Sequence, residues 1–190
     1  MFQTEEHIIE YILSERADLA DAVKERNIRN LALCLMDWTS GFVNYSWDDL
    51  IFDPQNRDFV ESFNILHQKQ NGLWCGGTAV FFRDLLRLFG IPSATFKYKY
   101  TEESRLSHVT TMYCDVTDNT FGIYLLDAYL NTYYIDAETG EMLYFEKLLE
   151  YILQNQYHMI KTIISPVRRS YLLRERIDPY NAYERTRLYP

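Results

Sequence analysis

The spacing of the apolar residues changes at Gly90–Pro92. Before this point apolar side chains recur three and four residues apart, the period of an amphipathic helix, and after it "ATFKYKY" alternates apolar and polar residues like a half-buried strand. Glycine followed two residues later by proline is itself a helix stop signal. Helices followed by antiparallel strands indicate an α+β fold rather than a doubly wound sheet.

The periodicity predicts the individual elements. Helices are expected around residues 8–13, 19–35 and 58–68 and from Cys75 to Phe89. Strands are expected at 94–100, 107–116 and 121–130, followed by a hairpin over 132–145 whose turn is "DAETGE", and a helical pattern at 146–164. We therefore predict a single domain over residues 1–164 and an Arg/Tyr-rich C-terminal extension over residues 165–190.

Composition narrows the class of protein. A chain of 190 residues is about the size of one domain, and its net charge of −8 disfavours a nucleic-acid binder, which needs a basic surface. The extension is the exception, because it holds six arginines against three acidic residues. It is expected to be a solvated surface segment or to dock on an acidic partner.

The start of the chain has acidic residues and no basic leader, and no run of about 18 apolar residues occurs, so we expect neither a targeting segment nor a membrane span. Three widely spaced cysteines without a CxxC pattern indicate neither a disulfide framework nor a zinc knuckle. The expected setting is the reducing cytoplasm.

The stretch "NGLWCGG" sets Cys75 at the start of a predicted helix. The positive end of a helix and a nearby imidazolium both favour the thiolate, the nucleophilic form of cysteine. Gly76 and Gly77 are poor helix formers, so they indicate a place where another strand or a substrate backbone approaches closely. Cys75 is therefore a candidate nucleophile, with a small core residue as the structural alternative.

A nucleophilic cysteine needs a base, and the base needs an orienting group. Of the four histidines, His108 alone falls on a predicted strand, just after a polar loop. Asp127 falls inside another predicted strand, where a carboxylate is costly without a partner. Two adjacent antiparallel strands would set this carboxylate against the imidazole ring.

These residues resemble a known family. The segments "LWCGGTAVFFRDLLRLFGIPSATF", "SHVTTMYCDV" and "IYLLDAYLN" are similar to the transglutaminase-like superfamily, a branch of the papain-like cysteine fold. The resemblance covers about a third of the chain. It implies N-terminal helices with the nucleophile helix packed on an antiparallel sheet, and a triad of Cys75 as nucleophile, His108 as general acid and base, and Asp127 as the residue that orients His108.

The hydrogen-bond donors of the oxyanion hole are predicted less precisely than the triad residues. The backbone N–H of Cys75 is the first candidate donor, because it lies at a helix start. The resemblance implies a second donor upstream, for which the candidates are Trp38, Trp47, Gln68 and Gln70, while Trp74 is expected to form a wall of the groove and Gly76 to allow close approach. No metal is predicted; a zinc site from Cys75, His108 and a second cysteine is the disfavoured alternative, since Cys34 and Cys114 are expected in the core.

The expected function is cysteine-dependent acyl transfer from an amide or thioester carbonyl through an acyl-Cys75 intermediate, as a peptidase or amidase or as an amide-forming acyltransferase. The partner is then a peptide, protein or small acyl substrate, and no cofactor is implied. Two alternatives remain open at this point: a catalytically silent peptide-binding module on the same fold, and a CoA-dependent enzyme similar to arylamine N-acetyltransferases, although that family's "RGG-x-C" pattern is absent here.

Overall fold

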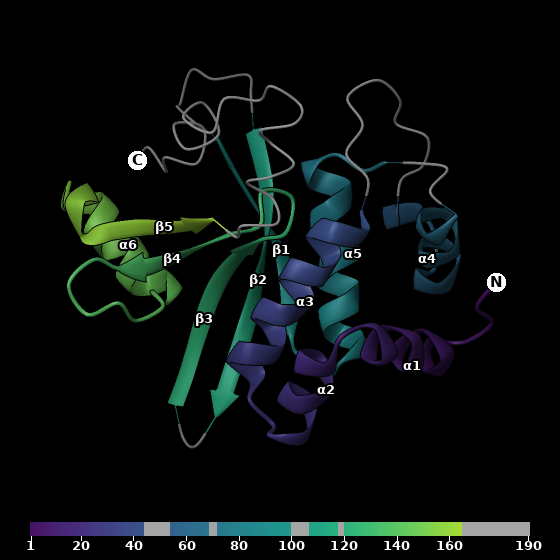
Figure 1. Cartoon of the computed structure of the whole chain (residues 1–190). Helices are drawn as coiled ribbons and strands as arrows, with labels where there is room; N and C mark the ends of the chain where they lie inside the picture. Colours follow the sequence, from purple (N-terminus) through teal and green to yellow (C-terminus); the bar gives the residue numbers. More distant parts are fainter. Residues whose placement is uncertain (44–53, 69–71, 100–106, 118–119, 165–190) are drawn as a thin grey trace.

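The computed structural model describes residues 1–43, 54–68, 72–99, 107–117 and 120–164 (Figure 1). Its helices are α1 (Glu5–Glu15), α2 (Ala17–Lys24), α3 (Ile28–Phe42), α4 (Phe59–His67), α5 (Cys75–Leu88) and α6 (Phe145–Leu153), with short 3-10 turns at Pro54–Asn56 and Tyr157–Met159. Its strands are β1 (Ser93–Lys99), β2 (Ser107–Thr117), β3 (Thr120–Asp127), β4 (Thr132–Asp136) and β5 (Ile160–Ile164).

In the described part of the chain, the strands form one five-stranded antiparallel sheet in the order β1-β2-β3-β4-β5. Each strand therefore pairs with its neighbours in the sequence, as an antiparallel meander allows. The helices α1 to α5 precede the sheet in the chain, and α3 and α5 lie beside β1 and β2 (Figure 1). The predicted α+β class is confirmed.

The predicted stop after α5 is present in detail. Gly90 has a left-handed φ of 76°, and the N–H of Ile91 donates to the carbonyl of Leu86 at 2.9 Å. This is the Schellman arrangement, in which glycine takes the conformation that L side chains disfavour. It turns the chain directly into β1, so the helix that begins at Cys75 lies against the sheet that it precedes.

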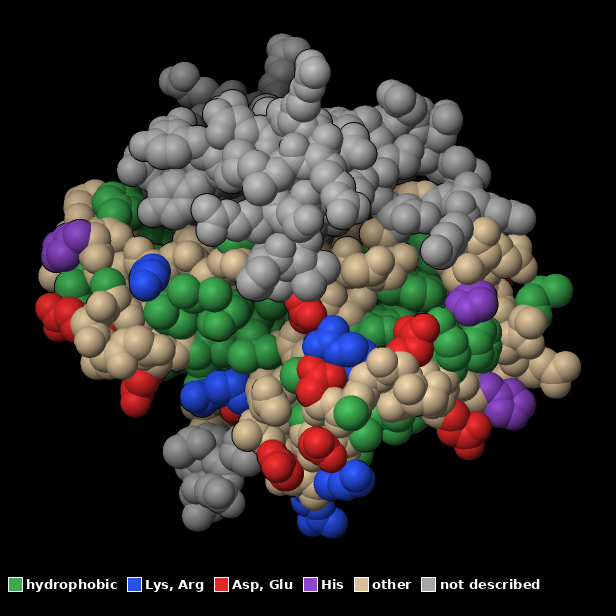
Figure 2. All heavy atoms as spheres, in the orientation of Figure 1, with side chains coloured by type: hydrophobic (Ala, Val, Ile, Leu, Met, Phe, Trp, Pro, Cys, Tyr) green, Lys and Arg blue, Asp and Glu red, His purple; other side chains and the backbone are tan. Residues whose placement is uncertain are grey.

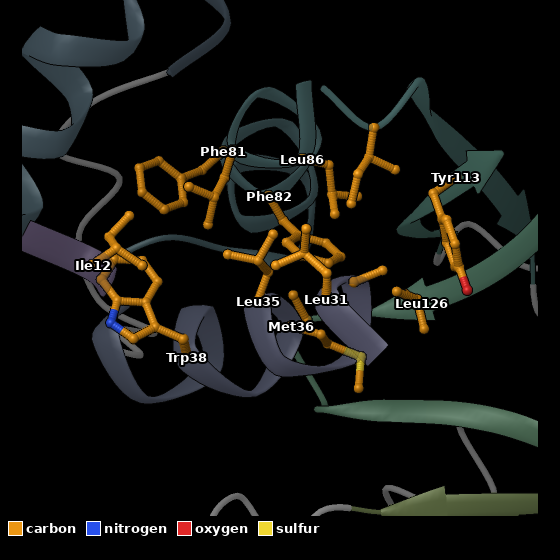
Figure 3. Close-up of a cluster of buried hydrophobic side chains, with 14 of the residues drawn as sticks. Ile12, Leu31, Leu35, Met36, Trp38, Phe81, Phe82, Leu86, Tyr113 and Leu126 are labelled. Atoms are coloured by element: carbon orange, nitrogen blue, oxygen red, sulfur yellow. The ribbon is translucent and has the colours of Figure 1, made fainter. Parts of the chain in front are cut away.

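The hydrophobic core lies on both faces of the sheet. Leu126 belongs to the larger cluster, which fills the space between α3, α5 and the sheet (Figure 3). Leu125, its neighbour in β3, belongs to a second cluster with Leu148 and Ile152 of α6. Consecutive strand residues point to opposite faces, so α6 covers the face opposite α3 and α5.

The prediction of one helix over 146–164 is wrong in its second half. Helix α6 ends at Leu153, and the chain then forms β5, which pairs with β4. Asn155 causes the break: its φ is 56°, and the N–H of Gln156 donates to the carbonyl of Tyr151 at 2.8 Å. Asparagine is the residue that most often replaces glycine at this helix-ending position, and the isoleucines that follow suit a strand.

The hairpin after β3 was only partly predicted. Strand β3 ends at Asp127 rather than at residue 130. The "DAETGE" turn is present, with the N–H of Gly140 donating to the carbonyl of Asp136 at 2.9 Å. The returning segment makes only single bridges, one of them between Ile135 and Met142, because α6 begins at Phe145.

Acidic and basic side chains are interspersed over the face that carries α2 and α3 (Figure 2). Among the described residues, no helix is long and apolar enough to cross a membrane. The predicted extension over 165–190 lies outside the described residues.

Candidate active site

Cys75 is the first residue of α5 and is half-buried. The residue before it, Trp74, has an extended backbone and makes no side-chain capping hydrogen bond, and its carbonyl accepts from the N–H of Thr78 at 2.8 Å. The amide N–H groups of the first turn precede the intrahelical ladder and form the positive end of the helix. The thiol therefore lies at the end of α5 that favours a negative charge.

His108 and Asp127 lie on neighbouring strands, near the start of β2 and at the end of β3. Thr111 is opposite Leu126 in the antiparallel register. One further step sets Thr110 opposite Asp127, so His108, two residues earlier, is a diagonal neighbour on the same face as the carboxylate. The contact predicted from the sequence is confirmed.

The imidazole and the carboxylate form a buried pair. His108 Nε2 lies 2.5 Å from Asp127 Oδ2, and the two residues are 4% and 3% exposed. The other carboxylate oxygen, Asp127 Oδ1, accepts the N–H groups of Tyr129 and Leu130, each at 3.0 Å. The turn after β3 therefore holds one oxygen of Asp127 while the other oxygen holds the ring.

The side chains of Cys75 and His108 hydrogen-bond to each other, and Nε2 is the ring nitrogen of His108 that faces Asp127. Burial raises the pKa of Cys75, but the hydrogen bond and charge of His108 and the N–H of Val109 outweigh it, and the pKa lies below its ordinary value. Burial lowers the pKa of His108, but the charge and hydrogen bond of Asp127, with a contribution from Cys75, raise it to about 10. The site therefore favours a thiolate beside an imidazolium.

The other two cysteines differ from Cys75 in this respect. Burial and the charge of Asp18 raise the pKa of Cys34 to about 11. Burial and the charge of Asp115 raise the pKa of Cys114 above its ordinary value. Cys34 packs against the larger core cluster, as predicted. Cys114, which was also expected in the core, is half-buried on β2 and belongs to neither core cluster of the described residues. Cys75 is the one thiol of the three with a lowered pKa.

The upstream candidates are dispersed. Trp38 is buried on α3, stacks on Phe42 and donates its indole N–H to Glu15 at 3.0 Å, so this donor is already used away from Cys75. Gln68 is exposed at the end of α4, and Trp74 is 42% exposed beside the thiol. Gln70 and Trp47 lie outside the described residues.

The two glycines after Cys75 have different surroundings. A Cβ on Gly76 would lie 3.9 Å from Val109 of β2, which is an ordinary contact. A Cβ on Gly77 would lie 3.1 Å from Leu73 Cδ2, which is tight. Close approach of a neighbouring strand therefore does not explain both glycines, because only Gly77 is crowded and Leu73 of the preceding segment crowds it. Close approach of a substrate backbone, the other predicted reason, stays a prediction.

Sequence reasoning did not anticipate the aromatic walls of the site or its second layer. The ring of Tyr98 meets the His108 ring edge-on at 5.5 Å, and the ring of Tyr129 lies 6.0 Å from it. The pairing of β1 with β2 sets Tyr98 opposite His108, so a strand alignment would have found it. The second layer is formed by Asp37, Ser40 and Asn131, which hydrogen-bond around the turn that follows Asp127.

In the described ranges, no group of three or more His, Cys, Asp or Glu side chains is arranged to hold a metal ion. The sulfur of Cys75 instead has the imidazole as its partner, and the imidazole has Asp127. This arrangement fits acid–base and nucleophilic chemistry.

No family model, no curated protein and no solved structure matches this chain.

Proposed function

We propose that this protein is a cysteine-dependent acyl-transfer enzyme on a papain-like, transglutaminase-like fold. Cys75 is the nucleophile, His108 the general acid and base, and Asp127 the residue that orients His108. One observation carries the proposal: the single cysteine with a lowered pKa begins a helix and bonds to a buried histidine that an aspartate holds.

The fold assignment is supported by how the elements carry these residues. The nucleophile begins α5, which packs on β1 and β2, and the histidine and aspartate come from β2 and β3 in that order. This order of helix and strands is what the resemblance of the sequence implies.

The reaction proceeds in two halves. The Cys75 thiolate attacks the carbonyl carbon of an amide or thioester, and the carbonyl oxygen takes the negative charge. The intermediate collapses as the bond to the leaving amine or thiol breaks, and His108 gives that group its proton, which leaves an acyl-cysteine thioester. Water or an amine then attacks the thioester and passes a proton to His108, and expulsion of the thiolate restores the starting state.

The oxyanion of each intermediate needs hydrogen-bond donors. The backbone N–H of Cys75 lies in the first turn of α5, where amide protons have no intrahelical acceptor. We assign this N–H as the first donor. Tyr98 and Tyr129, which flank His108, would help to exclude water from the ion pair.

The proposal is tested by trapping the acyl-enzyme. The full chain is mixed with a panel of thioester, glutamine-peptide and acetyl-CoA donors, quenched in acid, and measured by intact mass and by peptide mapping. An acyl adduct on Cys75 that is absent in C75A but present in C34S is expected. Failure of every donor to form this adduct, with C75A as active as the wild type on a thioester, would overturn the proposal.

The same experiment separates the alternatives. An adduct from acetyl-CoA alone would favour an N-acetyltransferase-like reaction. If no donor reacts and iodoacetamide labels Cys75 only above about pH 8, the chain is a binding module with an inert thiol.

A further inference from the structure

The turn that follows Asp127 is tied to helix α3. Ser40 donates its hydroxyl proton to the carbonyl of Ala128, and Asn131 Nδ2 donates to Asp37 Oδ1 at 2.7 Å. Asp37 and Ser40 are three residues apart and therefore lie on one side of α3. Two residues of α3 therefore hydrogen-bond to the first and the last residue of the four-residue turn 128–131.

Asp37 is itself held from its other side. Its Oδ2 accepts from Arg16 Nη1 at 2.9 Å, and the same guanidinium binds Asp18 through Nε at 2.8 Å. Arg16 is the single residue between α1 and α2. The carboxylate of Asp37 therefore links the N-terminal helices to the turn beside the site.

Asn131 has the left-handed backbone conformation, which glycine and asparagine adopt more readily than other residues. Its φ is 53°, it is fully buried, and its Oδ1 has no hydrogen-bond partner among the residues that the structure describes. A buried amide oxygen without a partner costs free energy. The hydrogen bond from Nδ2 to the Asp37 carboxylate is charge-assisted and offsets part of this cost, and it sets the orientation of the side chain.

We propose that Asp37 and Asn131 are positioning residues for Asp127. Their hydrogen bond fixes the turn whose Tyr129 and Leu130 N–H groups hold Asp127 Oδ1, so that Oδ2 stays directed at His108 Nε2. This assigns a role to the N-terminal helices. The use of the triad in acyl transfer rests on the proposed function, whereas the positioning itself is measurable without any substrate.

The consequence follows along the chain of contacts. Loosening the turn moves the carboxylate away from the ring, so His108 loses the charge that most raises its pKa. A less protonated ring in turn stabilises the Cys75 thiolate less. We therefore expect both pKa values to move back toward their ordinary values, that of His108 downward and that of Cys75 upward.

Two variants remove the hydrogen bond between Asn131 and Asp37. D37A removes the acceptor. N131G removes the donor without backbone strain, because glycine accepts a φ of 53°. NMR titration of the His108 ring protons and the pH dependence of Cys75 alkylation are measured in each, with far-UV circular dichroism at every pH. We expect the pKa of His108 to fall by at least about one unit, tenfold in its proton affinity.

Two controls separate position from charge. In D37N the amide oxygen can accept from Arg16. The amide nitrogen can donate to Asn131 Oδ1 once the Asn131 amide has rotated by about 180°. The hydrogen bond between positions 37 and 131 is therefore kept while the charge is lost. D18N removes a neighbouring charge that does not contact the turn. Both are expected to keep the pKa of His108 within about 0.3 units of the wild type, against the unit or more lost in D37A.

The proposal is overturned if N131G remains folded and leaves both pKa values unchanged, or if D37N shifts them as far as D37A. If D37A does not fold, S40A, which breaks the other hydrogen bond to the turn, takes its place, with a smaller shift in the same direction expected. A wild-type chain that forms no acyl adduct would refute the proposed function and leave this comparison of variants intact.

Discussion

The imidazole of His108 lies between two groups that both favour its protonated form. Asp127 supplies a carboxylate at 2.5 Å, and Cys75 supplies a thiol that gains stability as a thiolate when the ring is charged. Burial opposes both charges, so the ion pair exists only because each member compensates the desolvation of the other. The two groups therefore titrate together, and removal of one should be visible at the other.

Replacing His108 by alanine is expected to raise the pKa of Cys75. The hydrogen bond and charge of the ring are the largest effects that lower this pKa, and burial, which raises it, remains. The rate of iodoacetamide labelling at Cys75, followed by peptide mapping, should fall at neutral pH and rise with pH at a higher midpoint than in the wild type. A midpoint that stays in place in H108A would contradict this account of the thiol.

Labelling of the other two cysteines serves as an internal control. Their raised pKa values arise from burial and from aspartate charges, not from His108. Their labelling rates should therefore be the same in H108A and in the wild type. The substitution should also reduce any acyl-transfer activity by about 10²–10⁴-fold, the usual contribution of a general acid or base.

Strands β2 and β3 are joined by a packed pair of tyrosines that depends on a glycine. Tyr113 and Tyr124 stack at 5.4 Å, and Arg29 of α3 donates to the Tyr124 hydroxyl at 2.9 Å. A Cβ on Gly122 would lie 2.8 Å from a ring carbon of Tyr124, closer than real contacts allow. Glycine is therefore required here by the space that the neighbouring ring occupies.

G122A is expected to destabilise the fold by roughly 1–3 kcal/mol, the cost of overpacking a core. Urea unfolding of the variant measures it. The matched control is G41A, on an exposed part of α3 where an added Cβ meets nothing within 4 Å. It should be stabilising by about 0.5–1 kcal/mol through helix propensity. Equal effects of the two substitutions would show that space around Gly122 is not the reason.

The junction between α6 and β5 depends on Asn155. Valine is strained at a φ of 56°, so N155V should cost roughly 1–2 kcal/mol of unfolding free energy, whereas N155G should be neutral or slightly stabilising. Urea unfolding of the two variants checks this. A tolerated valine would mean that the end of α6 does not require the left-handed conformation.

The stability of the whole protein should depend on pH through His108. Its pKa rises from an ordinary 6.5 to about 10 on folding. A raised pKa contributes stability that is fully present below about pH 6.5, declines as pH rises toward 10, and is absent above it. The unfolding free energy from urea titrations should therefore fall between about pH 6.5 and pH 10.

D127N isolates this contribution. Without the carboxylate charge, the pKa of His108 in the folded state lies closer to its ordinary value, so the decline with pH should be smaller. Groups that do not interact with this site contribute equally in both proteins, so the difference between the two curves reports the His108–Asp127 pair together with Cys75, which titrates with His108. Parallel curves would mean that this pair does not stabilise the fold.

Local patterns in the sequence determined much of this protein. The change of apolar period at Gly90, the strand pattern that carries His108, and the cysteine at a helix start are all properties of a few neighbouring residues. Such patterns act within one turn or one strand, and they predicted the α+β class and the contact of His108 with Asp127. Asn155 is a local signal for the end of α6, but the spacing of the isoleucines after it fits both a helix and a strand, so the pattern alone did not predict β5.

Tertiary structure alone decided which side chains meet from distant parts of the chain. Nothing near Asp127 in the sequence indicates that Asp37, itself bound by Arg16, hydrogen-bonds to the turn after Asp127. Nor does the sequence indicate that the indole N–H of Trp38 donates to Glu15. These contacts depend on how α3 packs against α1, α2 and the sheet. Contacts between side chains that lie 21 to 95 residues apart in the sequence leave no periodic pattern in it. The residues that support the candidate site, unlike its three central residues, could therefore be found only in three dimensions.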